Sequence, residues 1–290
     1  LDEPPAWVAI SEDLFLAPGA LLGEAVIDTS PKIALGVDLT RFVAPVEDAG
    51  VVVGARVVHG DAQREIRCRW LVLASGAVPQ ALIAAGMALR QRPSGVALRG
   101  YLRNDAMRSQ IDQLEVIWHR AVAPGYGWIF PCRDGVFNVG VGAFTSRDVN
   151  LRALLDAFTR IYPAARDLVA GGQWLTAPKG APLRTSLAGA RWSRPGLIVT
   201  GEAAGSTYAF TGEGIGKALE TGMHAAEAVL QGRAQHPDDA AVRADYEARL
   251  AALTPRFALY ERANWVNRHP WLADLVLWRG QRLLFVECKR

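Results

Sequence analysis

The feature that most constrains the fold is a glycine-rich crossing between an apolar run and a helical pattern. The run Gly196–Thr200, GLIVT, predicts a strand, and Gly201–Gly222 follows it as GEAAGSTYAFTGEGIGKALETG. We predict a helix over 212–231, capped by Thr211 and ended by Gly232. Its apolar stripe consists of Ile215, Ala218, Leu219, Met223, Ala226 and Val229. A strand, a glycine loop and a helix in this order are typical of sites that hold a phosphate or a cofactor.

The residue types of this loop favour a flavin over a bare phosphate. Glu202 stands at the carboxyl end of the predicted strand, where it would repel a phosphate but accept hydrogen bonds from sugar or polyol hydroxyls. Gly212, Gly214 and Gly216 leave N–H groups bare at the positive end of the helix, which favours an anion or an electron-rich carbonyl. A flavin meets both demands, because its ribityl chain adjoins a ring that becomes anionic on reduction. A plain turn is the alternative for GEGIG alone.

Strand patterns dominate the first half of the chain. Asp38–Asp48, Gly50–Gly60 and Arg64–Ser75 predict a three-stranded antiparallel meander with short turns. The third segment runs into LVLASGA, a continuous apolar stretch that predicts a strand buried on both faces of a larger sheet. From about 99 to 144, further strand patterns predict a second, mostly antiparallel sheet.

Helical patterns follow. A helix is predicted over Asn150–Ile161 with its first residue as the N-cap, and the tail is helical in character, divided by Pro255 and Pro270. The fold class is therefore α/β with α+β character. It comprises a Rossmann-like part with an antiparallel meander, a second antiparallel sheet and C-terminal helices.

Composition excludes several classes of protein. The chain has 290 residues, 50% hydrophobic and 21% charged, which is ordinary for a globular protein. Its net charge is only +3 and no dense basic run occurs, so no nucleic-acid partner is expected. The three cysteines and five histidines are scattered, so no metal is expected and a reducing, cytoplasmic location is predicted. No apolar run is long enough to span a membrane, and the N-terminus is unlike a signal peptide.

Several complete motifs of this chain resemble those of the geranylgeranyl reductase family of FAD-dependent oxidoreductases. That family is part of the superfamily that includes aromatic hydroxylases. Tyr126–Gly142, YGWIFPCRDGVFNVGVG, is similar to that family's YxWxFP-x8-GxG signature at every defined position. Lys179–Gly205 and the tail sequence RHPWLADLVLWR also follow the family. Gly201–Gly222 resembles the second flavin-contacting motif of the superfamily, commonly Gly-Asp. The resemblance covers about 71 to 290.

The resemblance implies which residues contact the cofactor. Glu202 takes the place of the Gly-Asp aspartate that bonds the FAD ribityl chain, and the helix start faces the flavin pyrimidine edge. Arg99 falls where the family often has Arg-x-Tyr beside the flavin, although Arg99 and Tyr101 are equally well interpreted as outward strand residues. The implied cofactor-binding residues are Gly201, Glu202, Thr211, Gly212, Gly214, Ile215 and Arg99.

The resemblance also implies a cavity for a long isoprenoid chain. Aromatic walls suit such a ligand, because a polyprenyl chain offers only apolar surface. The implied substrate-binding residues are Tyr126, Trp128, Phe130, Pro131, Gly140 and Gly142. The plainer interpretation is that alternate aromatic residues on one strand face form core.

The chain departs from the family in three places, and two of them concern the adenosine and pyrophosphate part of the cofactor. The family begins with a βαβ unit carrying GxGxxG, and no GxGxxG occurs in these 290 residues. Ser75 and Gly76 stand where the superfamily usually has Asp-Gly, and the family's cysteine-glycine-glycine segment is missing. The chain is either incomplete or has lost the dinucleotide site. An incomplete chain is the favoured explanation, because loss of a central strand would expose a large apolar edge.

The predicted domains follow from these matches. Residues 31–94 and 186–232 form an FAD-binding domain without its first βαβ unit. Residues 1–30 and 95–185 form a substrate-binding sheet domain, and residues 233–290 a C-terminal helical region.

The function implied is FAD-dependent reduction of C=C bonds in a prenyl lipid, with NAD(P)H or another reductant as electron donor. No catalytic side chain is assigned. The alternatives are an FAD-dependent aromatic or polyketide monooxygenase and a non-catalytic, lipid-binding remnant that holds no FAD. Tail residues suggest peripheral membrane contact, against the plainer interpretation of a helical cap. They are Trp265, Trp271, Trp278, Arg268, Arg279 and Arg282.

Overall fold

The structure is a computed structural model that describes residues 7–10, 40–59, 61–90, 92–145, 147–235 and 239–269. The chain divides into two compact units that interleave in sequence. The first unit comprises residues 1–91, 184–207 and 213–255, and the second comprises residues 92–183, 208–212 and 256–290. These boundaries lie close to the predicted divisions after 94 and after 185, while the functions assigned to the stretches stay predictions.

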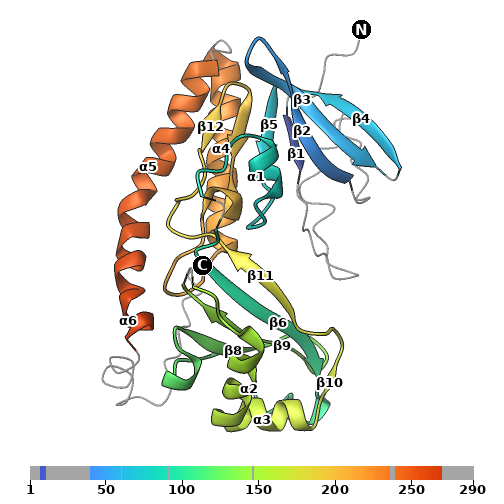
Figure 1. Cartoon of the computed structure of the whole chain (residues 1–290), viewed down its shortest axis with the longest axis vertical. Coiled ribbons are helices and arrows are strands. Elements are labelled where there is room, and N and C mark those ends of the chain that lie inside the picture. Colours follow the sequence, from blue (N-terminus) through green and yellow to red (C-terminus); the bar gives the residue numbers. More distant parts are fainter. Residues whose placement is uncertain are drawn as a thin grey trace. The chain divides into compact units, whose positions relative to one another are not determined.

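A mostly parallel sheet, with β12 antiparallel at one edge, forms the centre of the first unit (Figure 1). Its strand order is β1-β5-β13-β12, and both β1 and β13 run parallel to β5. The strands are β1 (Trp7–Ile10), β5 (Trp70–Leu73), β12 (Ser193–Arg194) and β13 (Leu197–Val199). The apolar runs of β5 and β13 are almost wholly buried, as expected for strands covered on both faces. Residues 7–10 were predicted in the second sheet with the rest of 1–30, and the pairing of β1 with β5 corrects that assignment for these four residues.

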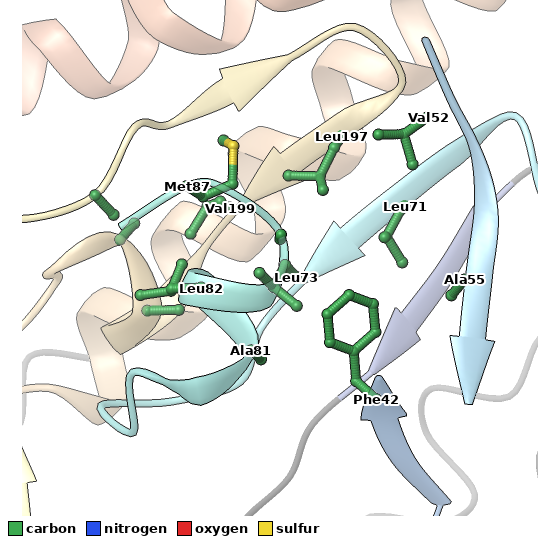
Figure 2. Packing of buried hydrophobic residues seen from close by; sticks show 14 of the residues in the cluster. Phe42, Val52, Ala55, Leu71, Leu73, Ala81, Leu82, Met87, Leu197 and Val199 are labelled. Carbon is green, nitrogen blue, oxygen red and sulfur yellow. The ribbon is translucent and has the colours of Figure 1, made fainter. Parts of the chain in front are cut away.

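The predicted meander is confirmed as a separate three-stranded antiparallel sheet. It consists of β2 (Thr40–Asp48), β3 (Val51–His59) and β4 (Ala62–Arg67). The predicted strand Arg64–Ser75 is two strands, because the chain leaves the meander after Arg67 and enters the parallel sheet at Trp70. Figure 2 shows Phe42 and Val52 of the meander packed with Leu71, Leu73 and the short helix α1 (Gln80–Ala84) in one core.

Helix α4 (Ile215–Gln235) follows the glycine loop and packs beside α5 (Asp239–Ala263) in the first unit. The prediction that Thr211 caps this helix is wrong. The first turn closes from the Ala218 N–H to the Gly214 carbonyl, so Gly214 holds the N-cap position. Gly232 does not end the helix either. A Cβ there would collide with Val242, so this glycine lets α5 approach α4.

The predicted apolar stripe of α4 is wrong in its orientation. Ile215, Leu219 and Met223 are 84%, 65% and 62% exposed. Of the predicted stripe only Val229 is buried, and the helix packs on the core mainly through a neighbouring face with Thr221, Ala225 and Ala228. Small side chains thus form the packed face, and periodicity alone could not say which of two apolar faces is covered. Pro255 lies inside α5 instead of dividing the tail, and the tail beyond 269 lies outside the described residues.

The second unit holds a six-stranded antiparallel sheet with β6 and β9 at its centre. The strand path is β10-β6-β9-β8-β7, and β11 also pairs with β6. The strands are β6 (Gly95–Arg103), β7 (Glu115–Ile117), β8 (Gly125–Pro131), β9 (Val136–Ala143), β10 (Gln173–Trp174) and β11 (Lys179–Leu183). This confirms the predicted second sheet.

Two helices cover one face of this sheet, as Figure 1 shows. Helix α2 (Leu151–Ile161) begins as predicted, since the Asn150 side chain accepts a hydrogen bond from the Ala153 N–H. Helix α3 (Pro163–Ala170) follows it, and the short α6 (Trp265–Arg268) lies near the end of the described chain. Leu154, Leu155 and Phe158 of α2 pack on the inward residues of β6, β8 and β9. The opposite face of the sheet carries the aromatic residues of the YxWxFP motif, Tyr126, Trp128 and Phe130.

Candidate functional site

The carboxyl ends of β5 and β13 meet at one edge of the parallel sheet. Val199 pairs with Leu73, and the Thr200 N–H donates to the Leu73 carbonyl over 3.1 Å. Both strands then turn sharply at a glycine with positive φ, +71° at Gly76 and +64° at Gly201. Parallel α/β sheets bind ligands at such an edge, so the fold places the predicted loop where a cofactor would be held.

Glu202 lies in this edge, in a short 3-10 helix over Gly201–Ala204. Its Oε1 accepts hydrogen bonds from the Arg184 N–H at 3.2 Å and from the Thr207 hydroxyl at 3.1 Å. A Cβ at Gly214 would lie 2.5 Å from the same Thr207 oxygen, which explains why glycine stands there. The carboxylate is therefore oriented by its own loop and by the backbone of Arg184, with one oxygen already engaged.

The charge state of Glu202 reflects opposing effects. Burial raises the pKa of its carboxyl group, because a carboxylate loses solvation there. The hydrogen bonds from Arg184 and Thr207, together with the Arg184 charge, lower the pKa of the same group. A ligand hydroxyl that donates to this carboxylate would add to the second set of effects.

Several buried polar atoms at this edge have no hydrogen-bond partner among the described residues. They are the hydroxyls of Ser75 and Ser206 and the Nη2 atom of Arg184, and each of these side chains is almost fully buried. Such groups usually pair with a ligand or ordered water. Unpaired hydroxyls beside a carboxylate fit a polyol chain, so the residues present are compatible with the ribityl part of a flavin.

The second half of the loop belongs to the second unit. The Tyr126 hydroxyl donates to the Thr211 carbonyl, and Phe210 stacks on Trp118 with 5.9 Å between ring centroids. Gly212 has φ +70°, and a Cβ there would collide with the Tyr126 oxygen. Burial raises the pKa of the Tyr126 phenol, so its hydroxyl stays protonated as a donor. Residues 208–212 are thus fastened to the sheet by aromatic side chains.

The YxWxFP residues alternate along β8. Tyr126, Trp128 and Phe130 share the face away from α2, whereas Ile129 points into the core. Tyr126 lies between Trp118 and Trp128 at 5.1 and 6.1 Å, and Phe130 stacks on Trp128 at 6.0 Å. The face is therefore one continuous aromatic surface. Tyr126 is only 7% exposed, as its interpretation as core requires, while Trp128, Phe130 and Pro131 are half-buried.

The glycines of the signature have a direct structural reason. Trp128 pairs with Gly140 across β8 and β9, and a Cβ at Gly140 would collide with its indole ring and lie 2.6 Å from the Leu98 carbonyl. Tyr126 pairs with Gly142 in the same way. The Trp128 Nε1 donates to Asn138 at 3.0 Å, which fixes the ring over the glycine. Aromatic rings lying over strand glycines are a known way to pin register.

Arg99 and Tyr101 lie on the same face of this sheet. Arg99 pairs with Gly140 and Tyr101 with Asn138, both of which belong to the aromatic face. The Arg99 guanidinium sits 5.2 Å from the centroid of the Tyr101 ring, and Arg99 is exposed. The geometry is compatible with both interpretations of these residues, so the cofactor contact of Arg99 stays a prediction.

The predicted site residues thus form two groups. Gly201, Glu202, Gly214 and Ile215 belong to the first unit, and Arg99, Thr211 and Gly212 to the second, with all six signature residues. Ile215 is exposed at the start of α4.

Sequence reasoning missed several residues that organise these groups, namely Arg184, Thr207, Trp118, Phe210 and Asn138. Phe210 and Thr207 lie inside the loop Gly201–Gly222, so the sequence did contain a signal for them. Nothing in the sequence separates Arg184 from an ordinary surface arginine.

Two further properties concern the described ranges. No cluster of three or more His, Cys, Asp or Glu side chains that could hold a metal occurs in them. Within the same ranges, no helix combines the length and apolar character needed to cross a bilayer.

The fold defines the class of protein first. A geranylgeranyl bacteriochlorophyll reductase-like protein from Thermoplasma acidophilum superposes with a TM-score of 0.66 at 22% identity, over 86% of this chain and 64% of that chain. A variant of Klebsiella pneumoniae HpxO in complex with FAD shares the fold with a TM-score of 0.55 at 19% identity, over 82% of this chain and 62% of that one. The chain shares its fold with these two proteins, which confirms the predicted fold class.

Sequence relatives then narrow the class. A menaquinone reductase of Mycobacterium tuberculosis is 33% identical over 218 residues, which is 66% of this chain and 51% of the relative. A digeranylgeranylglycerophospholipid reductase of Thermoplasma volcanium is 27% identical over 241 residues, 77% of this chain and 55% of the relative. No family model matches the chain. The chain is a homologue of these reductases, which confirms the resemblance to the geranylgeranyl reductase family. It spans about half the length of the curated relatives it matches.

Proposed function

We propose that this chain carries the flavin-facing and substrate-facing parts of an FAD-dependent reductase that saturates C=C bonds of a prenyl lipid. The observation that carries the proposal is the aromatic face of the second unit, in which Trp128 lies over Gly140 and stacks with Phe130. Relatives named as reductases of menaquinone and of digeranylgeranylglycerophospholipid support an apolar, prenylated substrate.

In this proposal each group of residues has a separate task. The Glu202 carboxylate accepts hydrogen bonds from the ribityl hydroxyls of FAD, and the Ser75 and Ser206 hydroxyls supply further polar partners. The N–H groups at the start of α4 favour the electron-rich edge of the ring. Trp128 and Phe130 bind the apolar chain and exclude water from it. Reduced flavin, when bound, supplies the hydride, and NAD(P)H is the proposed source of electrons.

The test is saturation of a prenyl lipid by the full chain. The protein is loaded with FAD, reduced anaerobically with dithionite and incubated with a geranylgeranyl lipid, and the product is analysed by mass spectrometry. We expect a gain of hydrogen pairs that Trp128→Ala reduces at least tenfold, while Arg194→Met, far from the aromatic residues in sequence, leaves the yield unchanged. Bound FAD without any saturated product would overturn the proposal.

The same experiment separates the alternative functions. Oxygen incorporation with NADPH and air would support a monooxygenase, and a chain that binds the lipid but no flavin would support a lipid-binding remnant. Peripheral membrane contact and a cytoplasmic location stay predictions. The residues invoked for the contact lie partly outside the described chain, although Trp265 is half-exposed at its end.

A further inference from the structure

Arg184 is the largest fully buried side chain described in the molecule, with 1% of its surface exposed. It follows β11 and belongs to the first unit. Its Nε donates to the Ala77 carbonyl at 2.9 Å, and its Nη1 donates to the Arg90 carbonyl at 3.1 Å. Its backbone N–H donates to Glu202 Oε1 at 3.2 Å. One residue therefore contacts the turn after β5, the segment after α1 and the loop after β13.

The backbone around Arg184 fixes where its side chain begins. The Thr207 N–H donates to the Arg184 carbonyl at 3.2 Å, and the Ser186 N–H donates to the Thr207 carbonyl at 3.3 Å. Thr207 in turn donates its hydroxyl to Glu202. The Arg184 side chain thus extends from backbone that is paired with the Glu202 loop, and its guanidinium reaches the turn that follows Ser75.

The electrostatic arrangement is unusual for a purely structural arginine. The Nε and Nη1 atoms of its guanidinium donate to neutral carbonyls, and the buried Nη2 has no partner among the described residues. Burial and the nearby Arg90 charge lower the pKa of Arg184, and the Glu202 charge raises the pKa of the same group. A buried charge is costly unless an opposite charge compensates it. Glu202 is the carboxylate that does so here.

We propose that Arg184 is the positioning residue of this edge. Its guanidinium ties the Ser75–Ala77 turn to the Glu202 loop and keeps Glu202 an acceptor for ligand hydroxyls. The identity of the ligand, the ribityl chain of FAD, rests on the proposed function, whereas the effect on Glu202 does not. Arg184 acts through Glu202 and Ala77 and touches no reacting atom.

The first test needs no ligand. The titration of the Glu202 carboxyl carbon is followed by NMR in the full chain and in Arg184→Met, Arg184→Lys and Arg194→Met. Arg184→Met leaves the backbone N–H bond to Glu202 in place, so it isolates the guanidinium. The Thr207 hydroxyl, which also acts on the pKa of Glu202, is unchanged, and so is the Arg90 charge, which acts on Arg184. We expect the midpoint to rise by about one pH unit or more in Arg184→Met.

The matched variants separate charge from geometry. Arg184→Lys keeps the charge but cannot reach both carbonyls, so its midpoint should stay near that of the wild type. Arg194→Met removes a half-buried arginine that pairs with Glu47 in the same unit, and its midpoint should not move. An unchanged midpoint in a folded Arg184→Met would contradict the proposal. If Arg184→Met does not fold, Arg184→Gln is titrated in its place, and the same outcome decides.

The second test uses FAD fluorescence quenching at neutral pH. Arg184→Met should weaken FAD binding about tenfold, and the loss should shrink in a Glu202→Gln background, because the two residues act in series. Equal losses in both backgrounds would contradict a role through Glu202. If the wild-type chain binds no FAD, the proposed function fails, while the NMR titration still decides the role of Arg184.

Discussion

Two regions of this molecule need glycine for different physical reasons. At the polar edge of the first unit, Gly201 permits a sharp turn and Gly214 makes room for the Thr207 hydroxyl. On the aromatic face of the second unit, Gly140 makes room for the Trp128 ring. The first region contains unpaired polar groups and a buried charge, and the second contains packed aromatic rings. Substitutions should therefore change ligand binding and pH dependence in the first region and stability in the second.

The largest effect is expected from Gly140→Ala. The added methyl would meet the Trp128 ring and lie 2.6 Å from the Leu98 carbonyl, which is backbone and cannot move aside. We expect a loss of about 3 kcal/mol in the free energy of unfolding, measured by urea denaturation. Gly142→Ala is the matched control, because its nearest neighbour would lie at an ordinary 3.6 Å, and it should cost less than about 0.5 kcal/mol. Equal losses would show that packing on Trp128 is not the reason for Gly140.

The next effect concerns the fastening of the loop. Tyr126→Phe keeps the ring but leaves the Thr211 carbonyl without its donor. We expect a loss of about 1–2 kcal/mol in unfolding free energy and faster proteolysis within 208–214. Tyr162→Phe, which removes a half-buried hydrogen bond to Glu115, should cost less, because the Glu115 carboxylate can turn to water. A loop that is cut no faster in Tyr126→Phe would contradict this role.

At the polar edge, the expected effect concerns how the free energy of unfolding depends on pH. The pKa of Glu202 is raised by burial, so the folded state holds a proton more tightly than the unfolded chain does. The stability contributed by this raised pKa is fully present below the unfolded-state pKa of about 4.3. It is lost as the pH rises through the higher folded-state pKa. Glu202→Gln should therefore show a smaller change of unfolding free energy with pH in this window than the wild type does. Urea denaturation of both proteins from pH 4 to 8 measures the two dependences, and an equal dependence in Glu202→Gln would contradict this role of Glu202.

The smallest effect compares one thiol from each unit. Cys68 is buried in the first unit and the pKa of its thiol is raised to about 11, whereas Cys132 is exposed in the second. Since the thiolate is the reactive form, iodoacetamide at pH 8 should label Cys132 at least about tenfold faster. Mass spectrometry of the peptides gives both rates. Similar rates would indicate that the first unit opens readily.

Part of this account could be predicted from the sequence. The two antiparallel sheets, the start of α2 and the place of the glycine loop after a buried strand follow from apolar periodicity and turn residues. The signature residues Trp128 and Gly140 came from a motif, and the structure supplies the reason for their spacing, since register pairs them across two strands.

The rest depended on tertiary packing. The stripe with Leu219 was predicted as the buried face of α4, yet a face of small residues packs instead. No local pattern reveals that Gly232 admits a neighbouring helix or that Pro255 lies within one. The partner of Glu202 was also hidden, because Arg184 is 18 residues away and reaches it only through the pairing of two loops.

The central claim is that the Glu202 edge receives the ribityl chain of a flavin. The most direct measurement compares riboflavin with lumiflavin, which has the ring but no ribityl chain, by fluorescence titration of the wild-type chain and of Glu202→Ala. The account predicts that the wild type binds riboflavin at least about tenfold more tightly than lumiflavin and that Glu202→Ala removes this preference. Equal affinity of the wild type for both flavins, or an undiminished preference in Glu202→Ala, would contradict it.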